Sequence, residues 1–144
     1  MNALYTATAT AVGGREGNAA SDDGKLNVKL GMPKELGGSG GEGTNPEQLF
    51  AAGYAACFES ALALVAQRQG MKISGTQVTA QVSLYKNGEA FKLGAELNVY
   101  IPNVDAAKTE ELAHAAHQVC PYSRATEGNI DVTIRASEQR SVSF

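Results

Sequence analysis

One helical segment constrains the fold of this chain more than any other feature. Asn45 can cap a helix, Pro46 suits its first position, and Gln48 is placed to complete a capping box. Gly70 is a typical stop after Gln69. The main apolar stripe recurs at spacings of 4, 3, 4 and 3, at Phe50, Tyr54, Cys57, Ala61 and Leu64. Because the other positions around Cys57 are also small or apolar, the sequence predicts a long helix, Pro46 to about Gln69, that is buried on every side.

Short strands are expected before this helix. Residues 6–12 and 26–30 alternate with a period of two, and turns over residues 13–17 and at Asp23-Gly24 favour an antiparallel meander of three strands. The loop that follows contains a literal G-x-G-x-x-G between residues 38 and 43. No buried strand directly precedes this loop and no βαβ unit surrounds it, so we reject a dinucleotide site there.

Longer strands and a second helix are expected after the long helix. The expected elements are strands over residues 78–85, 91–101 and 130–134 and a helix from Ala106 to about Val119. Asn87-Gly88 predicts a hairpin between the first two strands, and Asp105 can cap the second helix. The order β-β-β-α-β-β-α-β, dominated by hairpins, predicts an α+β fold with antiparallel sheets packed on the long helix, in a single domain over residues 1–144.

Composition and charge exclude several classes of protein. The chain is 43% hydrophobic and 19% charged, which favours a globular fold. No apolar run approaches about 18 residues and no signal peptide is visible, so we expect no membrane span and a cytoplasmic location. The net charge of −3, without a basic run, argues against nucleic acid as a partner. Two cysteines 63 positions apart are no disulfide scaffold and favour redox chemistry.

Cys57 and Cys120 are the candidate reactive groups. Cys57 is predicted near the middle of the long helix, where a buried cysteine acting only as a small hydrophobe is an equal alternative. Cys120 is at a helix break before Pro121, a position that is often exposed. If the two meet in the fold, they can cycle between a dithiol and a disulfide.

A reactive cysteine needs a positive charge nearby. The ordinary thiol pKa is about 8.5 and burial raises it. A depression by three units needs about 4 kcal/mol, which one cation at about 4 Å supplies at an effective dielectric constant of about 20. Arg15, in a glycine-lined turn, is the best candidate, and Glu47 could hold its guanidinium through a bidentate ion pair. The alternatives are a solvated turn charge and an acid that favours the helix dipole.

Distance along the helix constrains how these groups cooperate. Glu47 and Cys57 are ten residues apart, which is about 15 Å along a straight helix. One arginine hardly reaches both side chains in one copy of the helix. This spacing motivates a dimer in which a second subunit completes the site.

Two other functions compete with thiol chemistry. His114, His117 and Cys120 form H-x-x-H-x-x-C, which raises the possibility of a metal site, although no fourth ligand is evident nearby. A binding or sensing module with a structural Cys57 is the remaining alternative.

Several segments together resemble one known family. They are residues 13–17 (GGREG), 33–38 (PKELGG), 45–58 (NPEQLFAAGYAACF), 119–123 (VCPYS) and 128–132 (GNIDV). The chain resembles the organic hydroperoxide resistance proteins of the Ohr/OsmC family over essentially its whole length. The block that ends after Cys57 is highly specific, and the glycine-rich loop before it favours the Ohr branch.

The resemblance implies an antioxidant, thiol-dependent peroxidase that reduces organic hydroperoxides, including those of fatty acids. Cys57 would be the peroxidatic and Cys120 the resolving cysteine, with Arg15 and Glu47 as the activating pair. The family forms an intertwined homodimer and is re-reduced by dihydrolipoyl groups of lipoylated proteins. No cofactor and no metal are expected. Apolar side chains suited to a lipid-like substrate, or equally to the core, are Phe50, Tyr54, Phe58 and Leu64.

Two positions depart from the family pattern just after Cys120. Arg124 stands where the family commonly has asparagine, and Glu127 stands where it commonly has arginine. A cation four residues beyond Cys120 is placed to alter the environment of that thiol or the docking of a reductant. Because the four core positions are intact, we do not interpret these departures as a loss of activity.

Overall fold

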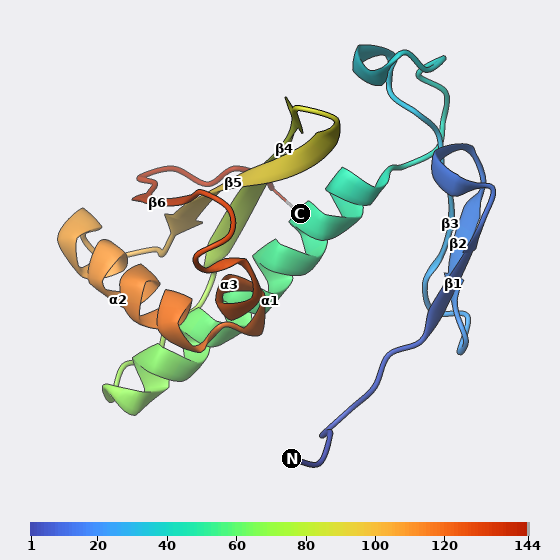
Figure 1. The fold of residues 1–144 in the computed structure, drawn as a ribbon. Coiled ribbons are helices and arrows are strands. Elements are labelled where there is room, and N and C mark those ends of the chain that lie inside the picture. The colour runs from blue at the N-terminus through green and yellow to red at the C-terminus, as the bar shows by residue number, and fades with distance from the viewer. Residues whose placement is uncertain (144) are drawn as a thin grey trace. The chain divides into compact units, whose positions relative to one another are not determined.

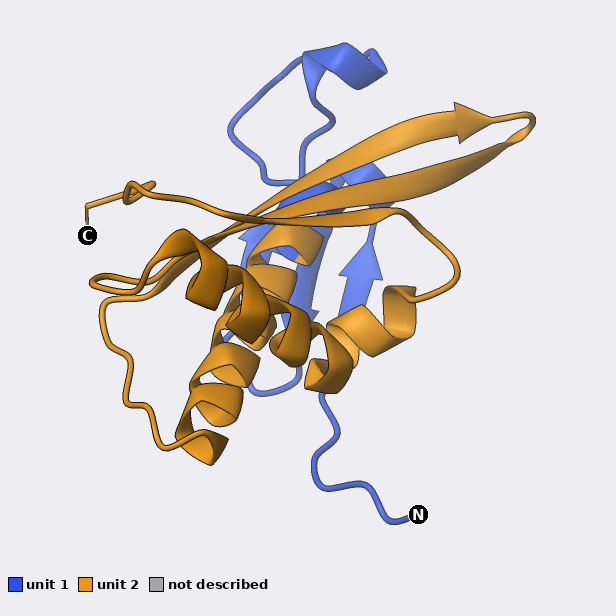
Figure 2. Cartoon of the chain, turned by 90° about the vertical axis from the view of Figure 1, so that its left-hand side faces the viewer, with its two compact units in different colours: residues 1–49 blue, residues 50–144 orange. Residues whose placement is uncertain are grey.

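The computed structural model describes residues 1–143, which divide into two compact units. The first unit is Met1–Leu49 and the second is the chain from Phe50 onward (Figures 1 and 2). The single domain expected over residues 1–144 stays a prediction, and its last residue, Phe144, lies outside the described residues.

The first unit contains the expected antiparallel meander. Its strands are β1 (Ala9–Val12), β2 (Asn18–Ser21) and β3 (Asn27–Lys29), in the order β1-β2-β3. Two 3-10 turns, η1 (Gly14–Glu16) and η2 (Lys34–Leu36), follow β1 and β3. Among residues 1–49, all of which the structure describes, Leu30 alone is buried. This unit therefore has almost no hydrophobic core of its own.

The long helix, α1 (Pro46–Arg68), begins in the first unit and continues through the second. As expected, the Asn45 side chain caps it, with Oδ1 accepting a hydrogen bond of 2.9 Å from the backbone N–H of Gln48. The predicted capping box is wrong, because the Gln48 side chain accepts a hydrogen bond of 2.6 Å from the Thr44 hydroxyl rather than bonding to the backbone of Asn45. One polar side chain thus stabilises the turn before the helix rather than the backbone of the cap.

The burial of α1 differs from the predicted stripe. The side chains buried on this helix are Tyr54, Phe58, Ala61, Leu62, Val65 and Ala66. Cys57 is only partly buried, and Leu64 is 41% exposed. Burial on every side is therefore wrong for this chain, because one face of α1 packs against the core and the opposite face stays exposed. By length and composition alone α1 could span a membrane, contrary to our expectation, but core helices of soluble proteins meet the same criterion.

The second unit contains a three-stranded sheet of order β4-β5-β6. Its strands are β4 (Gln77–Asn87), β5 (Ala90–Tyr100) and β6 (Val132–Ala136). The hairpin of β4 and β5 is antiparallel, with Gly88 in its turn at φ 67°. β6 pairs with β5 in parallel, with Ala95 opposite Val132, so the expectation of antiparallel sheets is wrong for this one pair of strands. The helical connection between β5 and β6 supplies the long crossover that parallel pairing needs.

That connection contains two helices, where the sequence predicted one. α2 (Ala106–Val119) has the expected Asp105 cap, whose carboxylate accepts a bond of 2.7 Å from the backbone of Lys108. α3 (Pro121–Thr126) was not predicted, and its proline occupies the first helical turn, as proline does favourably. The buried side chains of α1, β5 and α2 form one hydrophobic cluster, which stabilises the second unit.

Candidate active site

The structure brings Cys57 and Cys120 together. Their Sγ atoms lie 3.6 Å apart and both thiols are free. Cys57 comes from α1, and Cys120 lies at the junction where α2 ends and α3 begins. A disulfide needs its sulfurs at about 2.05 Å, so a movement of less than about 2 Å would join them. The meeting that the sequence left open is therefore present within the second unit.

The exposure of the two cysteines is the reverse of the prediction. Cys120 is fully buried, whereas Cys57 is only partly buried. The backbone N–H of Cys120 still donates to Ala116, at 2.9 Å, and its carbonyl accepts from Arg124, also at 2.9 Å. The break before Pro121 thus turns the chain into the core while both backbone groups stay paired. An external reagent reaches Cys57 before it reaches Cys120.

The environment of Cys57 does not favour its thiolate. Burial raises the pKa of Cys57, and the neighbouring Cys120 thiol raises it further. The backbone N–H of Tyr122 donates to the sulfur and offsets part of this rise in pKa. The helix dipole adds little, because Cys57 lies well beyond the first turn of α1. The second unit alone therefore holds Cys57 as a thiol near neutral pH.

Arg15 and Glu47 form an ion pair within the first unit. Nη1 of Arg15 lies 2.8 Å from one Glu47 carboxylate oxygen and 3.1 Å from the other. A single nitrogen thus contacts both oxygens, which differs from the predicted two-nitrogen fork. Arg15 lies in η1, after Gly13 at φ 82°, and a side chain at Gly17 would collide with the Val12 carbonyl. The glycines therefore permit the tight turn that presents Arg15.

An apolar groove of about 440 Å³ lies beside the segment that directly follows Cys120. It is lined by Phe50, Leu93, Pro121, Tyr122, Ala125, Thr126, Asn129 and Ile130. The Phe50 and Tyr122 rings form one wall, with their centroids 6.0 Å apart. Sequence reasoning missed Tyr122, although its place directly after Cys120-Pro121 is a local signal for it.

Only one of the four predicted substrate contacts lines this groove. Phe50 does so, whereas Tyr54 and Phe58 are fully buried in the core. Leu64 is exposed and is not part of the groove lining. A substrate role for these four residues stays a prediction.

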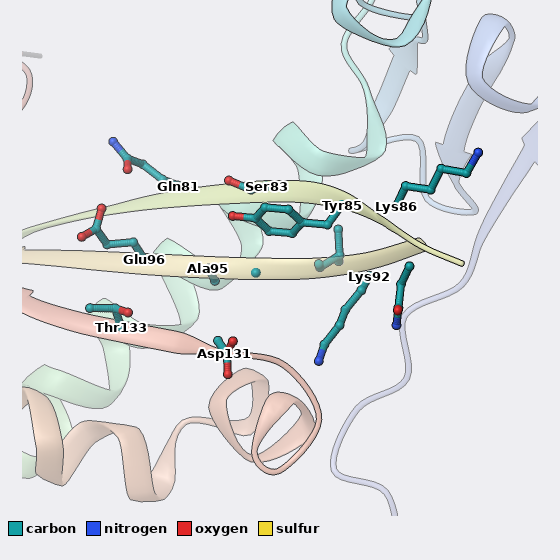
Figure 3. A pocket seen from close by; sticks show the side chains of 12 residues that line it. Gln81, Ser83, Tyr85, Lys86, Lys92, Ala95, Glu96, Asp131 and Thr133 are labelled. Atoms are coloured by element: carbon teal, nitrogen blue, oxygen red, sulfur yellow. The ribbon is translucent and has the colours of Figure 1, made fainter. Parts of the chain in front are cut away.

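The remaining candidate residues are partly or fully exposed. His114 is exposed and His117 is half-buried, and within residues 1–143 no three His, Cys, Asp or Glu side chains gather as a metal site. Arg124 and Glu127 are exposed. A polar groove of about 660 Å³, with Tyr85, Lys92 and Asp131 around it, runs along β4, β5 and β6 and contains neither cysteine (Figure 3).

Comparisons with known proteins identify the family. The family model described as "OsmC-like protein" matches residues 38–135. The chain is 53% identical to the organic hydroperoxide resistance protein of Xanthomonas axonopodis pv. citri, covering 91% of this chain and 93% of that one. It is 52% identical to organic hydroperoxide resistance protein OhrA of Bacillus subtilis, covering 94% and 97%.

Solved structures agree in fold. The organic hydroperoxide resistance protein OhrB of Bacillus subtilis matches with a TM-score of 0.87 at 49% identity, covering 94% of this chain and 100% of that one. The organic hydroperoxide resistance protein OsmC of Legionella pneumophila matches with a TM-score of 0.89 at 50% identity, covering 94% of this chain and 99% of that one. An α+β scaffold that holds two free thiols within reach of each other defines a dithiol protein. The chain belongs to the OsmC-like protein family, as the sequence resemblance predicted.

Proposed function

We propose that this protein is a cysteine-based peroxidase that reduces organic hydroperoxides to alcohols. The observation that carries the proposal is the pair of free thiols 3.6 Å apart, one half-buried and one buried. The relatives that are about half identical in sequence are named for resistance to organic hydroperoxides. A dithiol of this kind is suited to two-electron reduction of a peroxide.

The proposed reduction of the peroxide has two steps. The Cys57 thiolate attacks the distal peroxide oxygen, the O–O bond breaks, and the alkoxide takes up a proton to leave as the alcohol. Cys57 is then a sulfenic acid. Cys120 attacks its sulfur, the S–O bond breaks, and water leaves as the disulfide forms. The substrate gains two electrons and the two thiols lose them.

We assign the activation of Cys57 to Arg15. Burial raises the pKa of Cys57, and no cation among the described residues offsets this rise, so the reaction needs a positive charge at the sulfur. Arg15 and Glu47 match the activating pair of the family, and their ion pair is formed in the first unit. One cation near the sulfur contributes about 4 kcal/mol at a separation of about 4 Å. Glu47 acts by holding the guanidinium in place.

The groove beside Pro121 and Tyr122 suits the organic part of the substrate. Its lining is mostly apolar, and its volume of about 440 Å³ accepts an alkyl or aryl group. Hydrogen peroxide gains nothing from such a surface, whereas a fatty-acid hydroperoxide buries its chain there. We assign the preference for organic hydroperoxides to this groove.

A dihydrolipoyl group is the proposed reductant. A dithiol opens a disulfide by attacking one sulfur and then closing on itself, so no mixed disulfide accumulates. Cys57 is the accessible sulfur of the pair, and we assign the first attack to it. A lipoylated protein would deliver the dithiol on a flexible arm.

We also propose that the protein acts as a homodimer. The sheet of the first unit has almost no core, and short three-stranded sheets need a packed face to be stable. In the second unit, the exposed stripe of α1 comprises Ala52, Ala56, Glu59, Ser60, Ala63 and Leu64, most of which are small. A second copy of the chain would cover both surfaces. Light scattering tests this, since a fully active monomer contradicts it.

Steady-state turnover of cumene hydroperoxide tests the function. Wild type should turn over with dihydrolipoamide much faster than with glutathione. Cys57→Ser should lose turnover, and Cys120→Ser should complete one reduction and then stop or become over-oxidised. Full turnover by Cys57→Ser would mean that the peroxidase assignment is wrong. Unchanged cycling by Cys120→Ser would remove only the resolving role.

A further inference from the structure

The buried face of α3 is polar. The helix has six residues, and its buried side chains are Ser123 and Thr126, spaced so that they share one face. Because a helix of six residues is not stable alone, the position of α3 depends on tertiary contacts. Burying a hydroxyl costs free energy unless it is hydrogen-bonded. The partner of these two hydroxyls therefore decides where α3 lies.

Tyr54 of α1 is that partner. Its hydroxyl lies 2.9 Å from Oγ of Ser123 and 3.3 Å from Oγ1 of Thr126, and all three residues are buried. The Thr126 hydroxyl donates its proton to the Ser123 carbonyl, at 3.0 Å. Because each hydroxyl has one proton, Tyr54 donates to Thr126 and Ser123 donates to Tyr54. Every hydroxyl then donates once and the buried network is satisfied.

The network joins the same two segments as the sulfur pair. Tyr54 lies three residues before Cys57 on α1, and Ser123 lies three residues after Cys120. Three residues correspond to about 4.5 Å along a helix, so the network is nearly one turn from the sulfurs. A shift of α3 relative to α1 would change the hydroxyl distances and the sulfur distance together.

Ring packing holds the same junction without the hydroxyl. The Tyr54 and Tyr122 ring centroids lie 5.7 Å apart. A Cβ at Gly53 would approach the Tyr122 hydroxyl to 2.8 Å, so glycine leaves room for that ring against α1. Tyr54→Phe keeps the Tyr54 ring and removes only its hydrogen bonds. The variant therefore separates the positioning of α3 from the packing of the core.

We infer that Tyr54 is a positioning residue for disulfide closure. Its hydroxyl, through Ser123 and Thr126, fixes α3 so that Cys120 stays within reach of the Cys57 sulfur. The inference rests on the proposed peroxidase function for its biological meaning. It assigns Tyr54 to the resolving step and leaves the attack on the peroxide to the groups already described.

A single-turnover experiment without reductant tests the inference. One equivalent of cumene hydroperoxide is mixed with wild type and with Tyr54→Phe, and the Cys57 sulfenic acid is trapped with dimedone and followed by mass spectrometry. Tyr54→Phe should form sulfenic acid at the wild-type rate and close the disulfide at least about tenfold more slowly, as expected for the loss of the two hydrogen bonds that the buried hydroxyl makes. With excess hydroperoxide, Tyr54→Phe should also accumulate more sulfinic acid at Cys57.

Matched variants separate positioning from general damage. Tyr85→Phe removes a hydroxyl from a side chain that is 58% exposed on the sheet and should close at the wild-type rate. The double variant Tyr54→Phe with Ser123→Ala should close no more slowly than Tyr54→Phe alone, because the network acts as one unit. If Tyr54→Phe fails to fold, Thr126→Val replaces it, with the same expectation.

Three results would overturn the inference. The first is a folded Tyr54→Phe that closes the disulfide at the wild-type rate and yields no more sulfinic acid than wild type. The second is a Tyr54→Phe in which sulfenic acid formation and disulfide closure are slowed equally. The third is a double variant in which the effects of the two substitutions on the closure rate add. If wild type does not react with the hydroperoxide at all, the proposed function fails separately. Diamide, which accepts two electrons and two protons from the two thiols, then tests closure by itself, and wild-type closure in Tyr54→Phe would contradict the inference.

Discussion

The sulfur pair and the Arg15–Glu47 ion pair lie in two regions that are stabilised very differently. Around Cys57 and Cys120, side chains from α1, β5 and α2 form a continuous buried cluster. Around Arg15 and Glu47, the strands are three or four residues long and Leu30 is the one buried residue among residues 1–49. The geometry of the sulfurs is therefore intrinsic to the fold of its own unit. The geometry of the ion pair has little support from packed side chains of its own unit.

The difference separates the two requirements of the proposed reaction. Disulfide closure needs sulfurs at a fixed separation, which a well-packed core provides. Activation of the thiol needs a charge, and an ion pair in a loosely packed region is easily rearranged.

Truncation of the core gives the largest expected effect. Phe58→Ala removes a fully buried ring and should lower the free energy of unfolding by about 3–5 kcal/mol. Val12→Ala, at a side chain that is 72% exposed in β1 of the single chain, should change it by less than about 0.5 kcal/mol in the monomer. Urea denaturation measures both. A cost above about 2 kcal/mol for Val12→Ala at concentrations where the protein is a dimer would indicate that the second copy covers β1.

Neutralising Arg15 tests the charged region. Arg15→Gln should slow sulfenic acid formation at pH 7 about 100-fold, somewhat less than the full charge interaction because Arg15 is partly solvated. Because removal of a nearby cation raises the pKa of Cys57, the deficit should shrink as the pH increases. Stopped-flow rates between pH 6 and pH 10 measure it.

A second arginine variant serves as the control for the Arg15→Gln rates. Arg68→Gln changes the same charge at an exposed position at the end of α1 and should react at the wild-type rate. Equal slowing at every pH in Arg15→Gln would assign Arg15 to substrate binding rather than to activation of the thiol.

Alkylation tests the reversed exposure of the cysteines. Iodoacetamide should modify Cys57 at least about tenfold faster than Cys120 in the native protein, because only the Cys57 thiol reaches solvent. Both should react alike in urea. Peptide mass spectrometry distinguishes the two sites. Faster labelling of native Cys120 would contradict the burial described here and the assignment of Cys57 as the sulfur that the reductant attacks.

Local sequence signals predicted the elements and several turns. The Asn45 cap and Gly70 predicted α1 to within a residue, and Asn87-Gly88 predicted the hairpin. Asp105 predicted the start of α2. These predictions are correct because capping and turn formation involve residues that are neighbours in the chain. The motif residues also predicted the family, which the comparisons confirm.

Features that depend on tertiary docking were predicted wrongly or missed. α3 has too few residues to show a helical periodicity, and the side chains on its buried face carry hydroxyl groups rather than being apolar. The parallel pairing of β6 depends on where the crossover returns. Burial of Cys120 follows from α3 docking on α1, so a rule for helix breaks in general gave the wrong exposure. The same contacts bring the sulfurs together.

The smallest expected effect concerns stability at high pH. The pKa of Cys57 is raised in the folded protein above its unfolded value, so the unfolded chain loses this proton first as the pH rises. The stabilising contribution of the thiol is therefore present below the ordinary thiol pKa of about 8.5 and is lost as the pH rises through the folded value. Thermal denaturation from pH 6 to pH 10 of Arg15→Gln, with and without Cys57→Ala, measures it, because Arg15 no longer acts on the thiol in these variants. Arg15→Gln should lose Tm relative to the double variant only above about pH 8.5. A Tm difference that widens in favour of Arg15→Gln there would mean that another group holds Cys57 as a thiolate, and Arg15 would then not be the activating cation.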